Sequence, residues 1–303
     1  MNNASAPRMV ITVGIATAGR RAMLMQTLGQ LGQQTRLPDE VVICPSSPED
    51  CHDEGLSALP YPTRVVRGPR GLSAQRNAIL AACEVCDILV FFDDDFYPAA
   101  DYLAKLESLF TEQPDLVGAT GDVLSDGAIS RGITHSEALA ILAAHVPPSP
   151  GAEYAYEAYS LYGCNMALRM EPVRAHKLRC DERLPLYGWL EDVDLSRQIA
   201  RYGRLIKTTA LAGVHLAIKN GRSSGLRIGY SQIANPWYLL RKGTLDARHA
   251  FRQVSRNVAA NAYRSLNPEP WVDRRGRLQG NALATLHLLT GRLDPRKVLE
   301  LHQ

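Results

Sequence analysis

Short apolar segments rich in valine and isoleucine alternate with helical segments over the first 124 residues. Strands are predicted at 9–16 (MVITVGIA), 40–44 (EVVIC), 63–67 (TRVVR), 87–92 (DILVFF) and 116–124. Apolar residues at helical spacing predict helices over 22–34, over 73–86 with Ser73 as the N-cap, and over 100–112. Buried strands separated by helices are typical of a mainly parallel sheet with helices on both faces. We therefore expect an α/β fold with a ligand site at the carboxyl ends of the strands.

The second half of the chain is less regular. Helices are predicted over 135–144 and 189–202, and strands over 164–169, 204–209 and 212–217. After residue 219, the sequence NGRSSG (220–225) predicts a loop, and helices follow near 236–241, 247–262 and 278–290. We therefore expect a helical C-terminal extension to the α/β fold.

Charge is distributed unevenly along the 303 residues, although the formal net charge is only +3. Residues 1–200 contain 16 Lys and Arg against 26 Asp and Glu, whereas residues 201–303 contain 18 against 5. Such a basic C-terminal third attracts substrate phosphates or an anionic membrane surface, unless the acidic part of the same fold neutralises it. It lacks an aromatic and basic motif of a known nucleic-acid-binding type, so we expect no nucleic-acid partner.

Two absences in the sequence bear on location. No apolar run approaches the roughly 20 residues of a membrane-spanning helix, and the opening MNNASAPRMV lacks the pattern of a secretory signal. The six cysteines have no framework-like spacing and fit reduced thiols. We expect a cytoplasmic protein, attached at most peripherally to the inner face of the cell membrane.

Three consecutive carboxylates, Asp93, Asp94 and Asp95, follow the predicted strand 87–92. They repel one another, and a hard divalent cation such as Mg²⁺ or Mn²⁺ would offset that repulsion. Alternation along an extended backbone places Asp93 and Asp95 on one side and Asp94 on the other. Such a pair suits a cation that bridges a diphosphate, and a solvated acidic turn is the alternative interpretation.

Glycine-rich phosphate loops are absent, because neither GxGxxG nor GxxxxGK[ST] occurs. The sequence TAGRR (17–21), which follows the first predicted strand, has too few glycines for a nucleotidyltransferase loop. The phosphatase pattern DxDxT does not fit either, since Tyr97 stands at the threonine position. Phosphate binding must therefore use a metal ion and basic side chains.

Four segments, taken in order, resemble the family 2 glycosyltransferases, enzymes of the GT-A fold that transfer a sugar from a nucleotide diphosphate to an acceptor hydroxyl. They are VITVGIAT (10–17), RGPRGLSAQRNAIL (67–80), FFDDDF (91–96), and GCNMALRM (163–170) followed by LYGWLEDVDLSRQIARYG (186–203). The resemblance covers residues 9–245. It implies a nucleotide-sugar-binding half at 1–125, an acceptor-binding and catalytic half at 126–219, and a basic helical region at 220–303.

The resemblance implies a nucleotide site formed by Thr17, Arg20, Ser46, Arg76, Asn77, Asp93, Asp94 and Asp95. Asp95 is expected to bind Mn²⁺ or Mg²⁺, with Asp93 nearer the ribose and also a ligand candidate. His215 is the third ligand candidate, unless it is a core residue of its strand. In this family the second strand usually ends in an acid that binds the base, but PSS follows strand 40–44 here. A UDP-sugar is favoured as the donor, with dTDP-sugars and GDP-sugars as alternatives.

The pair Glu191 and Asp192 begins a predicted helix, whose free N–H groups and dipole favour ionised carboxylates. The resemblance implies that Asp192 is the general base and that Glu191 supports it or orients the acceptor. Otherwise both acids only complement the helix end. Tyr187 and Trp189, just before them, are candidates for the acceptor site or for the core.

Lys219, Arg222 and Arg227 are spaced along a glycine- and serine-rich loop that either closes over the diphosphate and excludes water or is an ordinary basic surface loop. The expected protein is an inverting, metal-dependent glycosyltransferase of the hexosyltransferase type. Its acceptor would be a glycan or lipid-linked glycan, in surface polysaccharide or glycolipid biosynthesis. A catalytically silent subunit that binds sugar nucleotides or polysaccharide with the same fold is the alternative.

Overall fold

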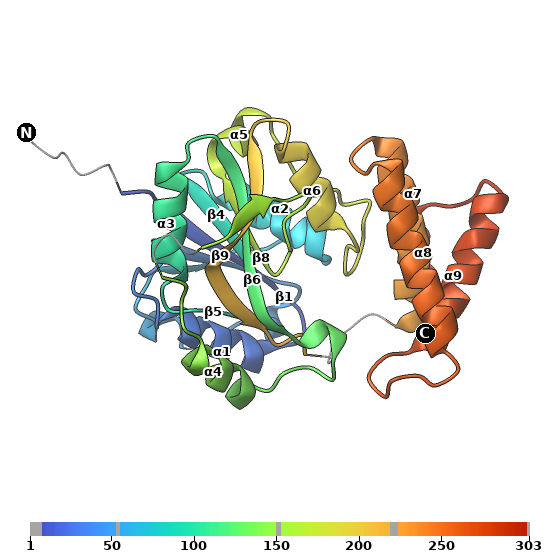
Figure 1. Cartoon of the computed structure of the whole chain (residues 1–303), viewed down its shortest axis with the longest axis horizontal. Coiled ribbons are helices and arrows are strands. Elements are labelled where there is room, and N and C mark those ends of the chain that lie inside the picture. Colours follow the sequence, from blue (N-terminus) through green and yellow to red (C-terminus); the bar gives the residue numbers. More distant parts are fainter. Residues whose placement is uncertain (1–7, 53–54, 150–152, 219–223, 302–303) are drawn as a thin grey trace, which may run out of the picture.

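The computed structural model describes residues 8–52, 55–149, 153–218 and 224–301. Figure 1 shows a twisted central sheet flanked by helices, with the helices α7, α8 and α9 grouped on one side. Within the described residues the sheet has nine strands, eight of them in the order β3-β2-β1-β4-β8-β6-β9-β5, and β7 pairs with β9. The expected α/β fold with a helical C-terminal extension is confirmed.

The parallel strands of the sheet bring their carboxyl ends, where the candidate site lies, to the same edge. β3, β2, β1 and β4 run parallel, β8 is antiparallel to both β4 and β6, and β6 runs parallel to β9. The carboxyl ends of β1 and β4 therefore lie together, at Thr17 and Asp93. The strands are β1 (Ile11–Thr17), β2 (Glu40–Pro45), β3 (Thr63–Val65), β4 (Ile88–Asp93), β5 (Phe96–Pro98), β6 (Leu116–Asp126), β7 (Ala155–Glu157), β8 (Asn165–Arg169) and β9 (Arg204–His215).

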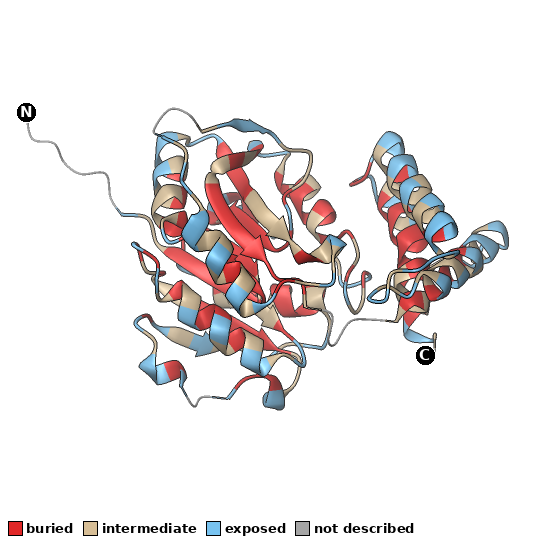
Figure 2. Ribbon diagram, turned by 60° about the horizontal axis from the view of Figure 1, so that its bottom comes forward, coloured by how far each residue is buried: buried red, intermediate tan, exposed pale blue. Residues whose placement is uncertain are grey.

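Helices cover both faces of the sheet, and each face has its own apolar core. On one face, α1 (Arg21–Leu31) and α3 (Tyr102–Glu112) pack against alternate residues of β1, β2 and β4. On the other, α2 (Leu72–Ala82), α5 (Met170–Ala175) and α6 (Glu191–Ile199) cover the remaining residues of these strands and β8. A further helix, α4 (His135–Ala144), packs near β9. In Figure 2 the buried residues follow the strands and the helix sides that face them, as two-sided burial of Val- and Ile-rich strands requires.

Two details of the sheet domain differ from the predictions. The segments 204–209 and 212–217 were expected as two strands, but β9 is continuous, because its pairing with β6 shifts register and so absorbs the irregularity as bulges. Ser73 is not the N-cap of α2. The helix begins at Leu72 after Gly71, and the Ser73 hydroxyl instead donates to the Leu184 carbonyl.

The C-terminal region forms three helices, α7 (Gly225–Lys242), α8 (Ala247–Arg264) and α9 (Arg274–Leu289). α7 begins well before the predicted start and contains Pro236, since its buried side offsets the cost of an interior proline. α7 and α9 approach each other through glycines. A Cβ on Gly229 would lie 2.0 Å from the Arg277 carbonyl oxygen, and one on Gly280 would lie 2.2 Å from that of Leu226.

Apolar and ionic contacts fix these helices to the sheet domain. Leu184, Leu190 and Val193, around the start of α6, pack with apolar residues of α7 and α8. Lys242 Nζ lies 2.7 Å from both Asp181 Oδ2 and Asp194 Oδ2. The position of α6 therefore depends on the C-terminal helices.

Candidate active site

Strand pairing brings together three side chains of the types that ligate metal ions. Phe96, at the start of β5, is in register with His215 at the end of β9, so the Asp93–Asp95 turn lies beside that histidine. His215 Nε2 is 3.7 Å from Asp93 Oδ2 and 3.6 Å from Asp95 Oδ1. The three ligand atoms all lie within 4.8 Å of one another. We call Asp93, Asp95 and His215 the cation corner, because two carboxylates and an imidazole suit a divalent ion such as Mn²⁺.

A further carboxylate, Asp126, orients the histidine of the cation corner. Asp126 and His215 are partners in the β6–β9 register, and Asp126 Oδ1 lies 2.9 Å from His215 Nδ1. The Tyr162 hydroxyl donates to the other Asp126 oxygen at 2.8 Å. A carboxylate on Nδ1 fixes the tautomer and leaves Nε2 for a metal. Sequence reasoning missed Asp126, because only the strand pairing brings it to His215.

Asp94 points away from the cation corner, as alternation along the chain predicts. Its Oδ2 accepts a hydrogen bond from Thr17 Oγ1 at 2.6 Å, and its Oδ1 pairs with Arg20 Nη2 at 2.6 Å. Arg20 also pairs with Asp95 Oδ2 at 2.7 Å. Thr17 and Arg20, at the end of β1, therefore hold the carboxylates in place from one side.

These charged groups shift one another's pKa values. Burial alone would raise the pKa of Asp95, but hydrogen bonding to His215 and the charge of Arg20 lower it to about 2. Burial raises the pKa of Asp94 to about 7 in spite of Arg20. Burial would lower the pKa of His215, but Asp126, Asp95 and Asp93 raise it to about 10. A divalent cation would balance this concentration of negative charge, so the residues fit the expected metal site.

Arg76 connects the cation corner to the helix that begins with the predicted base. Its side chain is only 1% exposed, so it is not a solvated helix residue. Its guanidinium forms an ion pair with Glu191, lies 3.3 Å from Asp93 Oδ1, and donates to the Gly163 carbonyl at 2.7 Å. Glu191 and Asp93 raise the pKa of Arg76 against the effect of burial, so it stays cationic. Arg76 therefore lies buried between Asp93 and Glu191, not on a solvent-exposed surface where a nucleotide would bind.

Asn77 has partners other than those expected. Its Nδ2 donates to the Cys180 carbonyl and to Glu182 Oε1, and its Oδ1 accepts from the Cys180 N–H. Both amide hydrogens are therefore used to hold the segment before α6, which leaves none to donate to a nucleotide. Gln75, which sequence reasoning missed, is the α2 residue that binds the strand ends, through the carbonyls of Thr17 and Cys44.

Glu191 and Asp192 begin α6 as expected. Asp192 Oδ2 accepts from the Gly163 N–H at 3.1 Å, and Oδ1 accepts from the Val193 N–H at 2.8 Å. Burial raises the pKa of Asp192, and it raises the pKa of Glu191 to about 7 in spite of Arg76. Glu191 is buried in its ion pair, whereas Asp192 is half-buried. Asp192 is therefore the more accessible of the two carboxylates.

Ser46, at the carboxyl end of β2, is held by an acid further along the chain. Its hydroxyl donates to Asp50 Oδ2 at 2.7 Å, and the other Asp50 oxygen accepts from the Gly19 N–H at 2.6 Å. Burial alone would raise the pKa of Asp50, but the bonds from Ser46 and Gly19 lower it. An ionised Asp50 only accepts, so the Ser46 hydrogen is committed to it.

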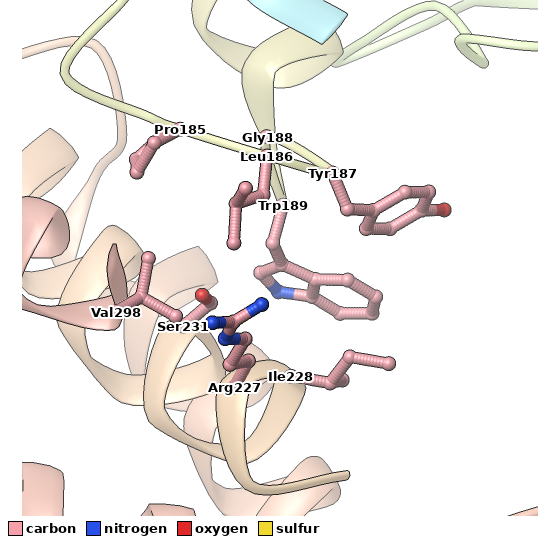
Figure 3. A pocket seen from close by; sticks show the side chains of 9 residues that line it. All are labelled: Pro185, Leu186, Tyr187, Gly188, Trp189, Arg227, Ile228, Ser231 and Val298. Carbon is pink, nitrogen blue, oxygen red and sulfur yellow. The ribbon is translucent and has the colours of Figure 1, made fainter. Parts of the chain in front are cut away.

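Tyr187 and Trp189 line a small pocket between the loop before α6 and the C-terminal helices (Figure 3). Tyr187 is 58% exposed, and the two ring centroids are 6.3 Å apart. Arg227 lines the same pocket from α7 and donates through Nε to the Leu301 carbonyl. It belongs to a helix rather than to the expected diphosphate loop. Lys219 and Arg222, the other expected loop residues, lie outside the described residues.

The mixed α/β sheet, the acidic turn at the end of β4 and the three side chains of metal-ligand type fit a glycosyltransferase of the GT-A fold. The family model described as glycosyl transferase family 2 matches residues 12–174, more than half of the chain. The chain belongs to this family and is a glycosyltransferase. A search of curated protein sequences found no match.

Solved structures share the fold at low sequence identity. The mannosyltransferase PcManGT from Pyrobaculum calidifontis, in complex with GDP-Man and Mn²⁺, is 16% identical with a TM-score of 0.55, over 97% of this chain and 86% of that one. TarS 1–349 from S. aureus, in complex with UDP-GlcNAc, is 16% identical with a TM-score of 0.52, over 96% and 91%. Among the described helices, none has the length and apolar character needed to cross a membrane.

Proposed function

We propose that the protein is an inverting, metal-dependent glycosyltransferase. Its donor is a nucleotide-diphosphate sugar, and its acceptor is a hydroxyl of a glycan or lipid-linked glycan in surface polysaccharide or glycolipid synthesis. One observation supports this above all: Arg76 joins the cation corner, through Asp93, to Glu191, the neighbour of Asp192. Solved relatives in fold hold GDP-Man with Mn²⁺ or UDP-GlcNAc.

The chemistry follows from the roles of these side chains. A divalent cation held by Asp93, Asp95 and His215 would supply positive charge beside the leaving diphosphate. Asp192 accepts the proton of the acceptor hydroxyl, whose oxygen forms a bond to the anomeric carbon. The bond from that carbon to the diphosphate oxygen breaks, and its electron pair leaves with the nucleotide. A single displacement inverts the anomeric centre and needs no carboxylate nucleophile.

We infer that Tyr187 and Trp189 flank the acceptor sugar, because both aromatic side chains lie just before α6, next to Glu191 and Asp192. Arg227 lies in the same pocket as these two rings, so we assign it to the acceptor side rather than to the diphosphate. The charged residues Lys219 and Arg222 remain candidates for a diphosphate-closing loop from the sequence alone.

The hydrogen bond from Ser46 to Asp50 bears on the nucleobase. With its hydrogen committed, the Ser46 hydroxyl can only accept at a base edge. Uracil, thymine and guanine can donate a ring N–H to such an acceptor, whereas cytosine can donate only through its exocyclic amino group. This supports a UDP-sugar, or a dTDP- or GDP-sugar, over a CDP-sugar.

The test combines nucleotide binding with turnover. UDP is titrated by calorimetry with and without Mn²⁺, and nucleotide release is measured with UDP-, dTDP-, GDP- and CDP-sugars in the presence of oligosaccharide acceptors. Asp95→Asn should abolish the Mn²⁺ dependence of UDP binding and lower turnover at least about 100-fold. Asp101→Asn, which removes a half-exposed carboxylate just before α3 that forms an ion pair with Lys105, is the matched control and should behave as wild type.

Each result has a distinct meaning. Binding that depends on Mn²⁺, with turnover on one donor, supports the transferase. Binding that depends on Mn²⁺ without turnover on any donor and acceptor tried supports the silent binding subunit instead. Full activity of Asp95→Asn would contradict both, because each relies on the cation corner.

A further inference from the structure

We propose that one face of α8 binds the surface of an anionic lipid bilayer. At 100° per residue, seven exposed residues fall on one side of this helix. The α8 face comprises Arg248, Phe251, Arg252, Arg256, Ala259, Ala262 and Tyr263. The opposite side packs inward, with Ala250 and Asn261 buried. In Figure 2 the outer sides of the C-terminal helices are exposed.

The α8 face has no negative charge of its own. The whole helix, 247–264, contains no Asp or Glu. Arg248, Arg252 and Arg256 follow at intervals of four and make no ion pair with any carboxylate in the described part of the chain. Like charges at this spacing repel one another on a helix surface. A dense anionic layer relieves that repulsion and attracts each guanidinium.

Large apolar side chains lie beside these arginines and are exposed. Phe251 is 76% exposed, Tyr263 is 79% exposed, and Leu266, just after the helix, is 83% exposed. Basic residues interleaved with exposed aromatic and aliphatic groups are typical of helices that lie in a membrane interface. A nucleic acid fits less well, because single strands are bound in a positively charged groove and this face is one convex helix surface.

The inner side of α8 contacts the acceptor region. Ala250 belongs to the apolar cluster that contains Leu190 and Val193. Trp189 packs against this cluster. The His249 ring stacks on Tyr159 of the sheet domain, with centroids 3.7 Å apart. Docking of the α8 face would therefore hold the pocket of Tyr187 and Trp189 near the lipid surface. This last step rests on the proposed function, and it favours a lipid-linked acceptor.

The experiment measures binding of the full-length protein to vesicles, without donor or metal. Flotation is compared between phosphatidylcholine vesicles with and without phosphatidylglycerol. Wild type should bind only the anionic vesicles, and high salt should release it. The variant Arg248→Gln/Arg252→Gln/Arg256→Gln should lose about fivefold in affinity per arginine, on the order of 100-fold in all. Phe251→Ser/Tyr263→Ser should weaken binding with all charges retained.

A matched control removes the same charge elsewhere. Arg201, Arg241 and Arg292 are exposed and lie outside α8, so their triple change to Gln should bind almost as wild type does. Thermal unfolding checks that all variants are folded. Equal binding of wild type to both vesicle types, no binding to either, or equal losses in the two triple variants would overturn the proposal. So would binding of single-stranded RNA, but not vesicles, through the α8 arginines.

The vesicle-binding experiment can fail or succeed independently of the test for transferase activity. Vesicle binding requires neither metal nor donor, and among the described residues the arginines of the α8 face form no ion pair with Asp93, Asp95 or Asp126. Nucleotide release from a soluble donor should therefore be unchanged in the α8 triple variant. Loss of release without loss of vesicle binding would count against the transferase alone.

Discussion

In the proposed metal site, His215 would bind the ion through Nε2, because Asp126 holds its Nδ1. We predict that Asp126→Asn lowers Mn²⁺ affinity about 10- to 100-fold, because partners of this kind orient a ligand and increase its basicity. Calorimetric titration of Mn²⁺ measures the effect. Asp122→Asn, on the same strand but paired at the surface with Lys207, is the control and should retain wild-type affinity.

The pKa of Asp192 sets the expected pH dependence. A base must be ionised, and burial raises the pKa of Asp192 above its ordinary value of about 3.9. Activity should therefore rise with pH over a range that lies above the ordinary titration of aspartate. Glu191, with a pKa of about 7, must also ionise to hold Arg76, which extends the rise to near-neutral pH.

The pH profile of kcat/KM checks this prediction at a fixed, saturating Mn²⁺ concentration. Asp192→Asn should lower kcat by about 10²- to 10⁴-fold, the usual contribution of a general base, with UDP affinity unchanged. A profile that is flat from acidic to neutral pH would exclude both carboxylates from this role.

At the scale of elements, α6 is held in place by an ionic contact with the end of α7. Lys242 neutralises Asp194, which is fully buried, and Asp181, whose side chain is 13% exposed. Burial alone would raise the pKa of Asp181, but Lys242 and Tyr238 lower it. Thr244 donates to the second oxygen of Asp194 at 2.6 Å. The helix that begins with Glu191 and Asp192 is therefore fixed by residues from outside the sheet domain.

We predict that Lys242→Met lowers the free energy of unfolding by about 3 kcal/mol, because it leaves two largely buried carboxylates without a cation. Arg241→Met removes the neighbouring exposed cation and should change stability by less than about 0.5 kcal/mol. Chemical denaturation of both variants measures the difference. Equal stability would show that the Lys242 contact contributes nothing to the fold.

The sequence predicts elements well where local pattern decides them. The Val- and Ile-rich strands β1, β2 and β4 and the helix α4 lie within a few residues of the predicted positions. Prediction fails where tertiary contacts decide. β9 remains one strand because β6 accommodates its bulges, and α7 extends through Pro236 because most of its first three turns are buried.

For the molecule as a whole, some residues of the candidate site can be predicted from local sequence, and others are brought together only by the fold. The acidic turn at 93–95 and the pair Glu191 and Asp192 can be found from sequence, because each is a local cluster at an element end. Asp126 and the bridge through Arg76 join residues from 17 to 115 positions apart, and only the folded sheet brings them together. The contact of the C-terminal helices with the residues around the start of α6 has no local signal either, since it depends on ordinary apolar side chains such as Leu190, Leu239 and Ala250.

The glycine contact between α7 and α9 also limits how this protein can evolve. Gly229 and Gly280 each face backbone of the opposite helix, so even alanine at either site would separate the pair. An insertion in either helix would have the same effect, because it would rotate a larger residue into the seam. Sequence drift in this bundle is therefore confined to its solvent side, where new binding properties can be acquired without disturbing the shared inner seam.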